Sequence, residues 1–205
     1  MNSTAAGPKP LSIILSEALA DEEVTIGELA DRVQRRGFGL AMIILALPTM
    51  IPVLPPGSSA LVGLLYILLA LQMLWGLEQP WLPHRLRAYR LSLQAVRGLR
   101  HRGVPFLERI ERYSRPRPLP LDERLVTRAV ALVMLILGVI LFLPIPFLNT
   151  LPAISVLVLG VGLLNRDSVF MLTGAAIATS VIIIIGFGAG TLYTLYAWLL
   201  HWAGR

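Results

Sequence analysis

The sequence predicts an all-α, polytopic membrane protein, and three observations lead to that fold class. Of its 205 residues 56% are hydrophobic and 15% are charged, whereas soluble domains are about 45–50% apolar and about 25% charged. The segments 57–77, 129–164 and 168–200 contain no charged residue, so each is a candidate for a helix that crosses the bilayer. One cluster of prolines lies directly before the first of these segments, and another lies inside the second. The alternative is an unusually apolar soluble core.

Residues 1–36 are predicted to form a small cytosolic helical module. Residues 11–20 have the pattern of a short amphipathic helix. Thr25 and Glu28 match the capping box, which predicts a helix from about residue 26 to about residue 36. Six acidic residues against four basic ones favour packing on the rest of the protein over binding to anionic lipid. No apolar segment typical of a cleavable signal peptide is expected here.

Two membrane hairpins with broken helices are predicted, over residues 37–77 and 129–167. The apolar stretches 38–47 and 153–164 would reach about 15 and about 18 Å as helices, less than the hydrocarbon core of about 30 Å. Short apolar segments interrupted by proline are typical of re-entrant or discontinuous helices. Aligning Pro55 with Pro152 also pairs Gly63 with Gly160, which favours an internal repeat, possible in parallel or inverted form. The alternative is one re-entrant loop plus one full span.

The broken helices are the predicted ligand site. Proline removes a backbone donor and leaves carbonyl groups unpaired, and the helix N-termini that follow favour anions. The candidate ligand-binding residues are Pro48, Thr49, Pro52, Pro55, Pro56, Gly57, Ser58, Ser59, Pro144, Pro146, Asn149, Thr150 and Pro152. The alternative is that the prolines only shape turns at the far face of the membrane.

Residues 78–128 are predicted to be a cytosolic loop, because they hold twelve arginines and five acidic residues. Leu86, Tyr89, Leu93 and Val96 recur at helical spacing, which predicts an interfacial helix in the loop. Its lipid-headgroup candidates are Arg85, Arg90, Arg97 and Arg100. The alternative is an Arg-rich amphipathic linker that serves only as a topology signal. Nucleic-acid binding is not expected.

The C-terminal membrane segment, 168–205, holds 33 uncharged residues over 168–200, too many for one crossing. Its glycines at 186–190 are predicted to break the helix, leaving either a hairpin or one span with an interfacial tail.

Enzyme chemistry, metals and cofactors are not expected. The chain has no cysteine, and its three histidines do not have the spacing of metal ligands. Residues 38–77 and 129–164 contain no Asp, Glu, Lys, Arg or His, which disfavours a proton antiporter that uses a buried carboxylate. Glu108 and Glu111 are expected to be solvated partners of Arg112 and Arg115 rather than an acid–base pair.

The motifs resemble a known family. "RGFGLAMIILALPTMIPVLPPGSS", "PWLP" and "LPIPFLNTLPA", followed by Arg166–Asp167, are similar to the ExoD-type exopolysaccharide-synthesis family of bacterial inner-membrane proteins. The resemblance covers about residues 11–185 and implies a role in exopolysaccharide production, in some members with tolerance of alkaline conditions, but no reaction. The residues that match its motifs are Arg36, Gly37, Phe38, Gly39, Pro48, Pro52, Pro55, Pro56, Gly57, Pro144, Pro146, Asn149 and Pro152.

The functional prediction is a small transporter in the bilayer that binds an anionic or lipid-phosphate ligand at the broken-helix ends. So few spans barely enclose a cavity, so a homodimer is expected. The alternative is a non-transporting scaffold or regulatory subunit of a polysaccharide assembly complex, which would dock partners on the arginine-rich loop. An enzyme acting on a lipid-linked substrate ranks third, for want of a catalytic group.

Overall fold

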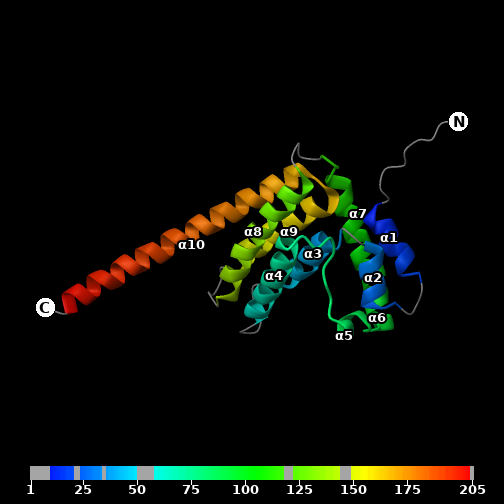
Figure 1. Ribbon diagram of the computed structural model, residues 1–205, viewed down its shortest axis with the longest axis horizontal. Helices are drawn as coiled ribbons and strands as arrows, with labels where there is room; N and C mark the ends of the chain where they lie inside the picture. The colour runs from blue at the N-terminus through cyan, green and yellow to red at the C-terminus, as the bar shows by residue number, and fades with distance from the viewer. Residues whose placement is uncertain are drawn as a thin grey trace.

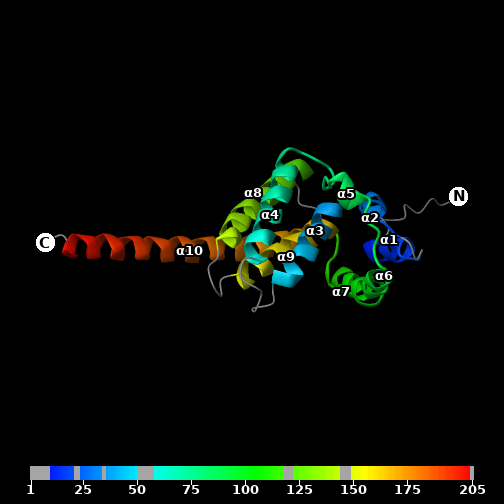
Figure 2. The ribbon, with the colours of Figure 1, turned by 90° about the horizontal axis from the view of Figure 1, so that it is seen from below.

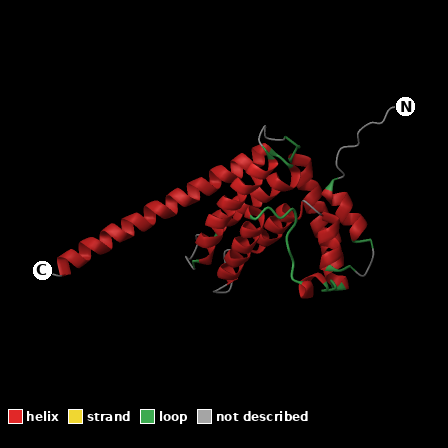
Figure 3. Cartoon of the chain, in the orientation of Figure 1, coloured by secondary structure: helices red, strands yellow, loops and turns green. Residues whose placement is uncertain are grey.

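The computed structural model describes residues 10–20, 24–33, 36–49, 58–117, 122–143 and 149–203. Within these ranges the chain is mainly helical (Figure 3). Two isolated β-bridges join Thr25 to Arg90 and Arg117 to Asp167. The helices are α1 (Leu11–Ala18), α2 (Ile26–Val33), α3 (Gly37–Thr49), α4 (Ser58–Leu74), α5 (His84–Arg87), α6 (Leu93–Gly98), the π-helical η2 (Leu99–Gly103), α7 (Val104–Tyr113), α8 (Glu123–Phe142), α9 (Thr150–Asn165) and α10 (Ser168–Ala203). The all-α prediction is confirmed for this part of the chain.

Helices α3, α4, α8 and α9 form a bundle together with the first half of α10 (Figures 1 and 2). The pair α3–α4 and the pair α8–α9 interlock, because α3 packs along α9 and α4 packs along α8. Glycines allow both crossings: a Cβ at Gly39 would lie 2.8 Å from the carbonyl oxygen of Gly160, and one at Gly63 would lie 2.7 Å from that of Gly138. The helices therefore approach at backbone distance.

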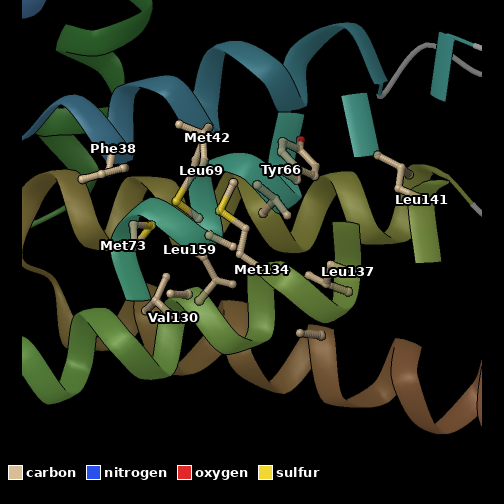
Figure 4. Close-up of a cluster of buried hydrophobic side chains, with 14 of the residues drawn as sticks. Phe38, Met42, Tyr66, Leu69, Met73, Val130, Met134, Leu137, Leu141 and Leu159 are labelled. Atoms are coloured by element: carbon tan, nitrogen blue, oxygen red, sulfur yellow. The ribbon is translucent and has the colours of Figure 1, made fainter. Parts of the chain in front are cut away.

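The bundle has two ends, which we name by the segments beside them. At the proline end, α3 and α8 stop and α4 and α9 begin; at the loop end, α4 finishes and α8 starts. Buried apolar side chains fill the space between these ends (Figure 4). Figure 4 labels Phe38, Met42, Tyr66, Leu69, Met73, Val130, Met134, Leu137, Leu141 and Leu159.

The outer faces of the bundle are also apolar. Two helical stretches, Glu123–Phe142 and Ser168–Gly188, are long and apolar enough to cross a membrane. Only 33% and 22% of their most apolar windows are buried, whereas the core helix of a soluble protein is mostly buried. Large exposed side chains such as Leu61, Leu132 and Leu172 are therefore suited to contact lipid, which favours association of the chain with a membrane.

The N-terminal helices and the loop 78–117 fold together beside the bundle (Figure 1). We call α1, α2, α5, α6, η2 and α7 the peripheral module. The predicted capping box is confirmed: the backbone N–H of Thr25 donates to Glu28 Oε2 at 3.0 Å, and that of Glu28 donates to Thr25 Oγ1 at 3.2 Å. Leu11 and Leu15 of α1 share an apolar cluster with Leu107 of α7 and with Val161 of α9, which seats the module on the bundle.

The helix predicted from Leu86 to Val96 is interrupted. Its central residues pair instead with the N-terminal segment: Ile26 N–H donates to the Tyr89 carbonyl at 3.1 Å, and Leu91 N–H donates to the Val24 carbonyl at 2.9 Å. Those long-range hydrogen bonds keep the segment between α5 and α6 from being helical. The prediction of one interfacial helix was wrong because spacing alone does not reveal such pairing.

The break predicted at glycines 186–190 was also wrong. Helix α10 continues through them as one helix of 36 residues, about 54 Å long. Glycine costs only about 1 kcal/mol in a helix interior, and the segment contains no proline. The second half of α10 leaves the bundle, and a Cβ at Gly186, Gly188 or Gly190 would meet no atom within 4 Å (Figure 1).

Candidate functional site

At the proline end, the last turn of α3 carries a buried hydroxyl group. Thr49 is 1% exposed, and its Oγ1 donates to the Ala46 carbonyl at 2.7 Å. Pro48, one residue earlier, has no N–H, so the helix cannot complete its bond to the Ile44 carbonyl. Tyr66 on α4 is fully buried (Figure 4); its hydroxyl lies close to Thr49 and has no hydrogen-bond partner among the described residues.

The start of α9 lies level with this turn. Helices α3 and α9 are antiparallel and touch at Gly39 and Gly160. Thr49 follows Gly39 by ten residues and Thr150 precedes Gly160 by ten residues, so the two threonines lie at the same level of the bundle. Asn149 occupies the N-cap position of α9, but its side chain caps no backbone N–H. Pro152 lies buried in the first turn, where a missing N–H removes no helical bond.

The structure thus brings Thr49, Asn149, Thr150 and Pro152 to one end of the bundle. Ser59, largely buried, lies two turns before Tyr66 on the same face of α4. Pro48 and Ser58 are helical, but their side chains are not among those described. The remaining predicted ligand residues, Pro52, Pro55, Pro56, Gly57, Pro144 and Pro146, lie outside the described residues.

A cavity of about 630 Å³ lies at the opposite, loop end. That volume is within the range of about 300–1,000 Å³ typical of ligand sites. Its apolar lining is Phe38, Met73, Trp75, Leu77, Val126, Leu163 and Met171; its polar and charged lining is Glu78, Asp122, Glu123, Arg124, Thr127, Arg128 and Arg166, with Gly76 between α4 and the loop. Phe38 and Met73 also belong to the buried core, so the cavity ends where the core begins.

The described residues do not neutralise all the charges in this cavity. Glu123 and Arg166 form an ion pair with Oε1 and Nη1 2.8 Å apart, and the Asp122 carboxylate accepts from the backbone N–H of Arg124 at 3.1 Å. Arg124 and Arg128 form no ion pair with any described residue. They stand four residues apart on α8, so both guanidinium groups project from the same face.

Sequence reasoning missed this site because five separate segments contribute to it. The available signal was a pair of arginines one turn apart where the uncharged run of α8 begins. Of the predicted lipid-headgroup residues, Arg85 lies on α5, Arg97 on α6 and Arg100 on η2, all exposed on the peripheral module. Arg90 lies at the β-bridge to Thr25.

Two carboxylates, Glu111 and Asp167, accept hydrogen bonds that hold separate segments of the chain together. Glu111 was expected to pair with arginines, but its Oε1 accepts from the backbone N–H groups of Leu11 at 2.6 Å and Ser12 at 3.2 Å, so it caps α1 from α7. Asp167 is 1% exposed and accepts from Ser114 Oγ, Arg115 N and Val169 N at 3.1, 2.9 and 3.0 Å. It ties the end of the peripheral module to the turn between α9 and α10.

Comparison with known proteins identifies relatives of the chain. Residues 11–187 match the family described as "Exopolysaccharide synthesis, ExoD". Protein ExoD of Rhizobium meliloti is 33% identical over 173 residues, which cover 81% of this chain and 72% of that protein. The Synechocystis sp. protein slr1875 is 32% identical over 161 residues, 78% of this chain and 75% of that protein. No solved structure matches.

Proposed function

Because the chain belongs to the ExoD family of exopolysaccharide synthesis, we propose that it is a membrane transport protein of that process. Its ligand is an anion or a lipid-linked phosphate, taken up where the helices break at the proline end. One observation carries the proposal: Thr49, at the end of a 13-residue helix, is buried at the level of the uncapped start of α9. Helix ends leave unpaired backbone N–H and C=O groups that a ligand can satisfy.

The interlocked packing supports a repeat built from two hairpins. In such a repeat α3 corresponds to α8, and α4 corresponds to α9. The contact between Gly39 of α3 and Gly160 of α9 then corresponds to the contact between Gly138 of α8 and Gly63 of α4. Both hairpins would enter and leave at the loop end, so we propose a parallel repeat. The exposed arginines of the peripheral module favour a bacterial inner membrane with this module in the cytoplasm, where Arg85, Arg90, Arg97 and Arg100 meet lipid headgroups. A homodimer would enclose the proline ends.

The experiment is flux in liposomes that contain the purified full chain. The vesicles are loaded with ³²P-phosphate or with a labelled sugar phosphate, and efflux is measured beside that of protein-free vesicles. Asn149→Ala should lower efflux at least tenfold while the amount of inserted protein stays unchanged. Efflux at the protein-free rate for every anion tested would refute transport of these anions.

A scaffold remains the second candidate function, because the peripheral module is a folded unit with an exposed basic turn. Arg100 and Arg102 lie on η2, next to Arg97 at the end of α6. The triple variant Arg97→Gln, Arg100→Gln, Arg102→Gln should abolish exopolysaccharide production if the chain is a scaffold. A transporter should retain most of its flux with the same three changes.

A further inference from the structure

We infer that the cavity at the loop end is a binding site for a phosphate-bearing amphiphile, with Arg124 and Arg128 on the phosphate. This site is separate from the broken-helix ends, since the cavity is lined by the first turn of α3 and the last turn of α4. The proline end lies at the other end of both helices. Binding in the cavity at the loop end is therefore independent of the transport proposed above.

The anion preference follows from which charges are already satisfied. Arg166 is held by Glu123, Asp122 accepts a backbone N–H, and Glu78 has a partner of its own. The two guanidinium groups of Arg124 and Arg128 remain without an ion pair among the described residues. Like charges one turn apart repel each other, and an anion held between them removes that repulsion. Guanidinium groups bind phosphate oxygens through paired N–H donors.

The preference for an amphiphile follows from the rest of the lining. Seven apolar side chains share the cavity with the charged ones, and a free phosphate would leave them exposed to water. The cavity also lies at the boundary of the apolar bundle. The uncharged segment that contains α4 ends at Leu77, just after the helix, and the uncharged part of α8 begins at Ala129, directly after Arg128.

Exposed tryptophan marks the same boundary. Trp75 in the lining is 77% exposed, and Trp81 nearby in the chain is 64% exposed. Tryptophan is enriched where hydrocarbon meets headgroups. A ligand with its phosphate at Arg124 and Arg128 and its chain along Trp75 and Met73 would match both parts of the cavity.

The test is a ³¹P NMR titration of the purified full chain in micelles of dodecyl maltoside, a neutral detergent. Dodecyl phosphate, dodecylphosphocholine and inorganic phosphate are the three probes. We expect saturable line broadening with dodecyl phosphate, and affinities at least tenfold weaker for the other two. Equal affinity for inorganic phosphate would make this a free-anion site, and equal affinity for dodecylphosphocholine a zwitterionic lipid site; either result would overturn the inference.

Matched variants locate the binding. Arg124→Gln with Arg128→Gln should lower the affinity for dodecyl phosphate at least tenfold. The control is Arg109→Gln with Arg112→Gln, which removes the same charge from exposed positions of α7 and should change the affinity less than twofold. An equal loss of affinity in both double variants would show general charge attraction. An unchanged affinity in the variant of Arg124 and Arg128 would likewise overturn the inference.

A third variant separates loss of folding from loss of the site. Trp75→Ala removes an exposed side chain that the core does not need. The variant should lower the affinity for dodecyl phosphate at least threefold and leave the weak affinity for inorganic phosphate unchanged. An unchanged affinity for dodecyl phosphate would contradict the assigned path of the alkyl chain.

Discussion

Gly63 of α4 meets Gly138 of α8 backbone to backbone, with no room for a side chain between them. A Cβ placed at Gly63 would lie 2.7 Å from the Gly138 carbonyl oxygen and 2.5 Å from the backbone nitrogen of Phe142. Neither atom is the end of a flexible side chain, so neither can move aside alone. Close approach of helices through small residues is the main source of stability where the surroundings are as apolar as the interior.

Gly63→Ala should therefore destabilise the bundle. Alanine gains about 1 kcal/mol of helix propensity, but overpacking of this kind typically costs about 1–3 kcal/mol, so we expect a net loss of up to about 2 kcal/mol. Thermal unfolding in detergent, followed by circular dichroism, measures the change.

Gly186→Ala is the matched control for that substitution. A Cβ there meets no atom within 4 Å, so only the propensity gain remains and the melting temperature should stay level or rise. A fall at Gly186 as large as that at Gly63 would mean that the crossing at Gly138 is not the cause.

Local signals in the sequence predicted local structure well. The capping box at Thr25 and Glu28 was confirmed because its two hydrogen bonds join residues three apart, so the pattern contains the whole interaction. The break predicted at glycines 186–190 was wrong because a glycine affects a helix only locally. Their cost is local and small, and the pattern contained nothing that would end α10.

Long-range relationships could not be predicted in this way. Helices α3, α4 and α9 are apolar on all sides, so no stripe tells which face meets which neighbour. The pairing of α3 with α9 depends on glycines such as Gly39 and Gly160, far apart in the chain. The cavity at the loop end depends in turn on that pairing. The position of the helix ends at the proline end could be predicted, because proline interrupts a helix whatever the helix packs against.

Glu111→Ala should loosen α1. The carboxylate accepts two backbone N–H groups at the start of that helix, and loss of such a cap costs about 1 kcal/mol. Hydrogen exchange of the amides of Leu11 and Ser12 should accelerate roughly fivefold. Glu108→Ala, on an exposed position of the same α7, should leave both amides unchanged; equal acceleration would show a general effect on α7.

Asp167→Ala should strongly destabilise the protein, because it removes a buried carboxylate that accepts three hydrogen bonds. It leaves the donors of Ser114, Arg115 and Val169 without their acceptor, and a stranded buried donor costs about 1–3 kcal/mol. We expect a loss of about 3 kcal/mol in the free energy of unfolding, measured by thermal unfolding in detergent. Asp122→Ala removes an exposed cap from α8 and should cost only about 1 kcal/mol; equal costs would mean that burial of Asp167 is not decisive.

Thr49→Val tests whether the proline end acts in function or only in packing. The two side chains have nearly the same volume, and valine removes the hydroxyl that faces Tyr66 and bonds to the Ala46 carbonyl. If this hydroxyl helps a ligand to pass, phosphate efflux from liposomes should fall about tenfold while the melting temperature changes by only a few degrees. Thr173→Val is the control, because Thr173 donates the same kind of bond, to the Val169 carbonyl, from an exposed position of α10 outside the cavity lining. A large fall in melting temperature at Thr49 with unchanged efflux per folded protein would assign the buried hydroxyl to structure alone.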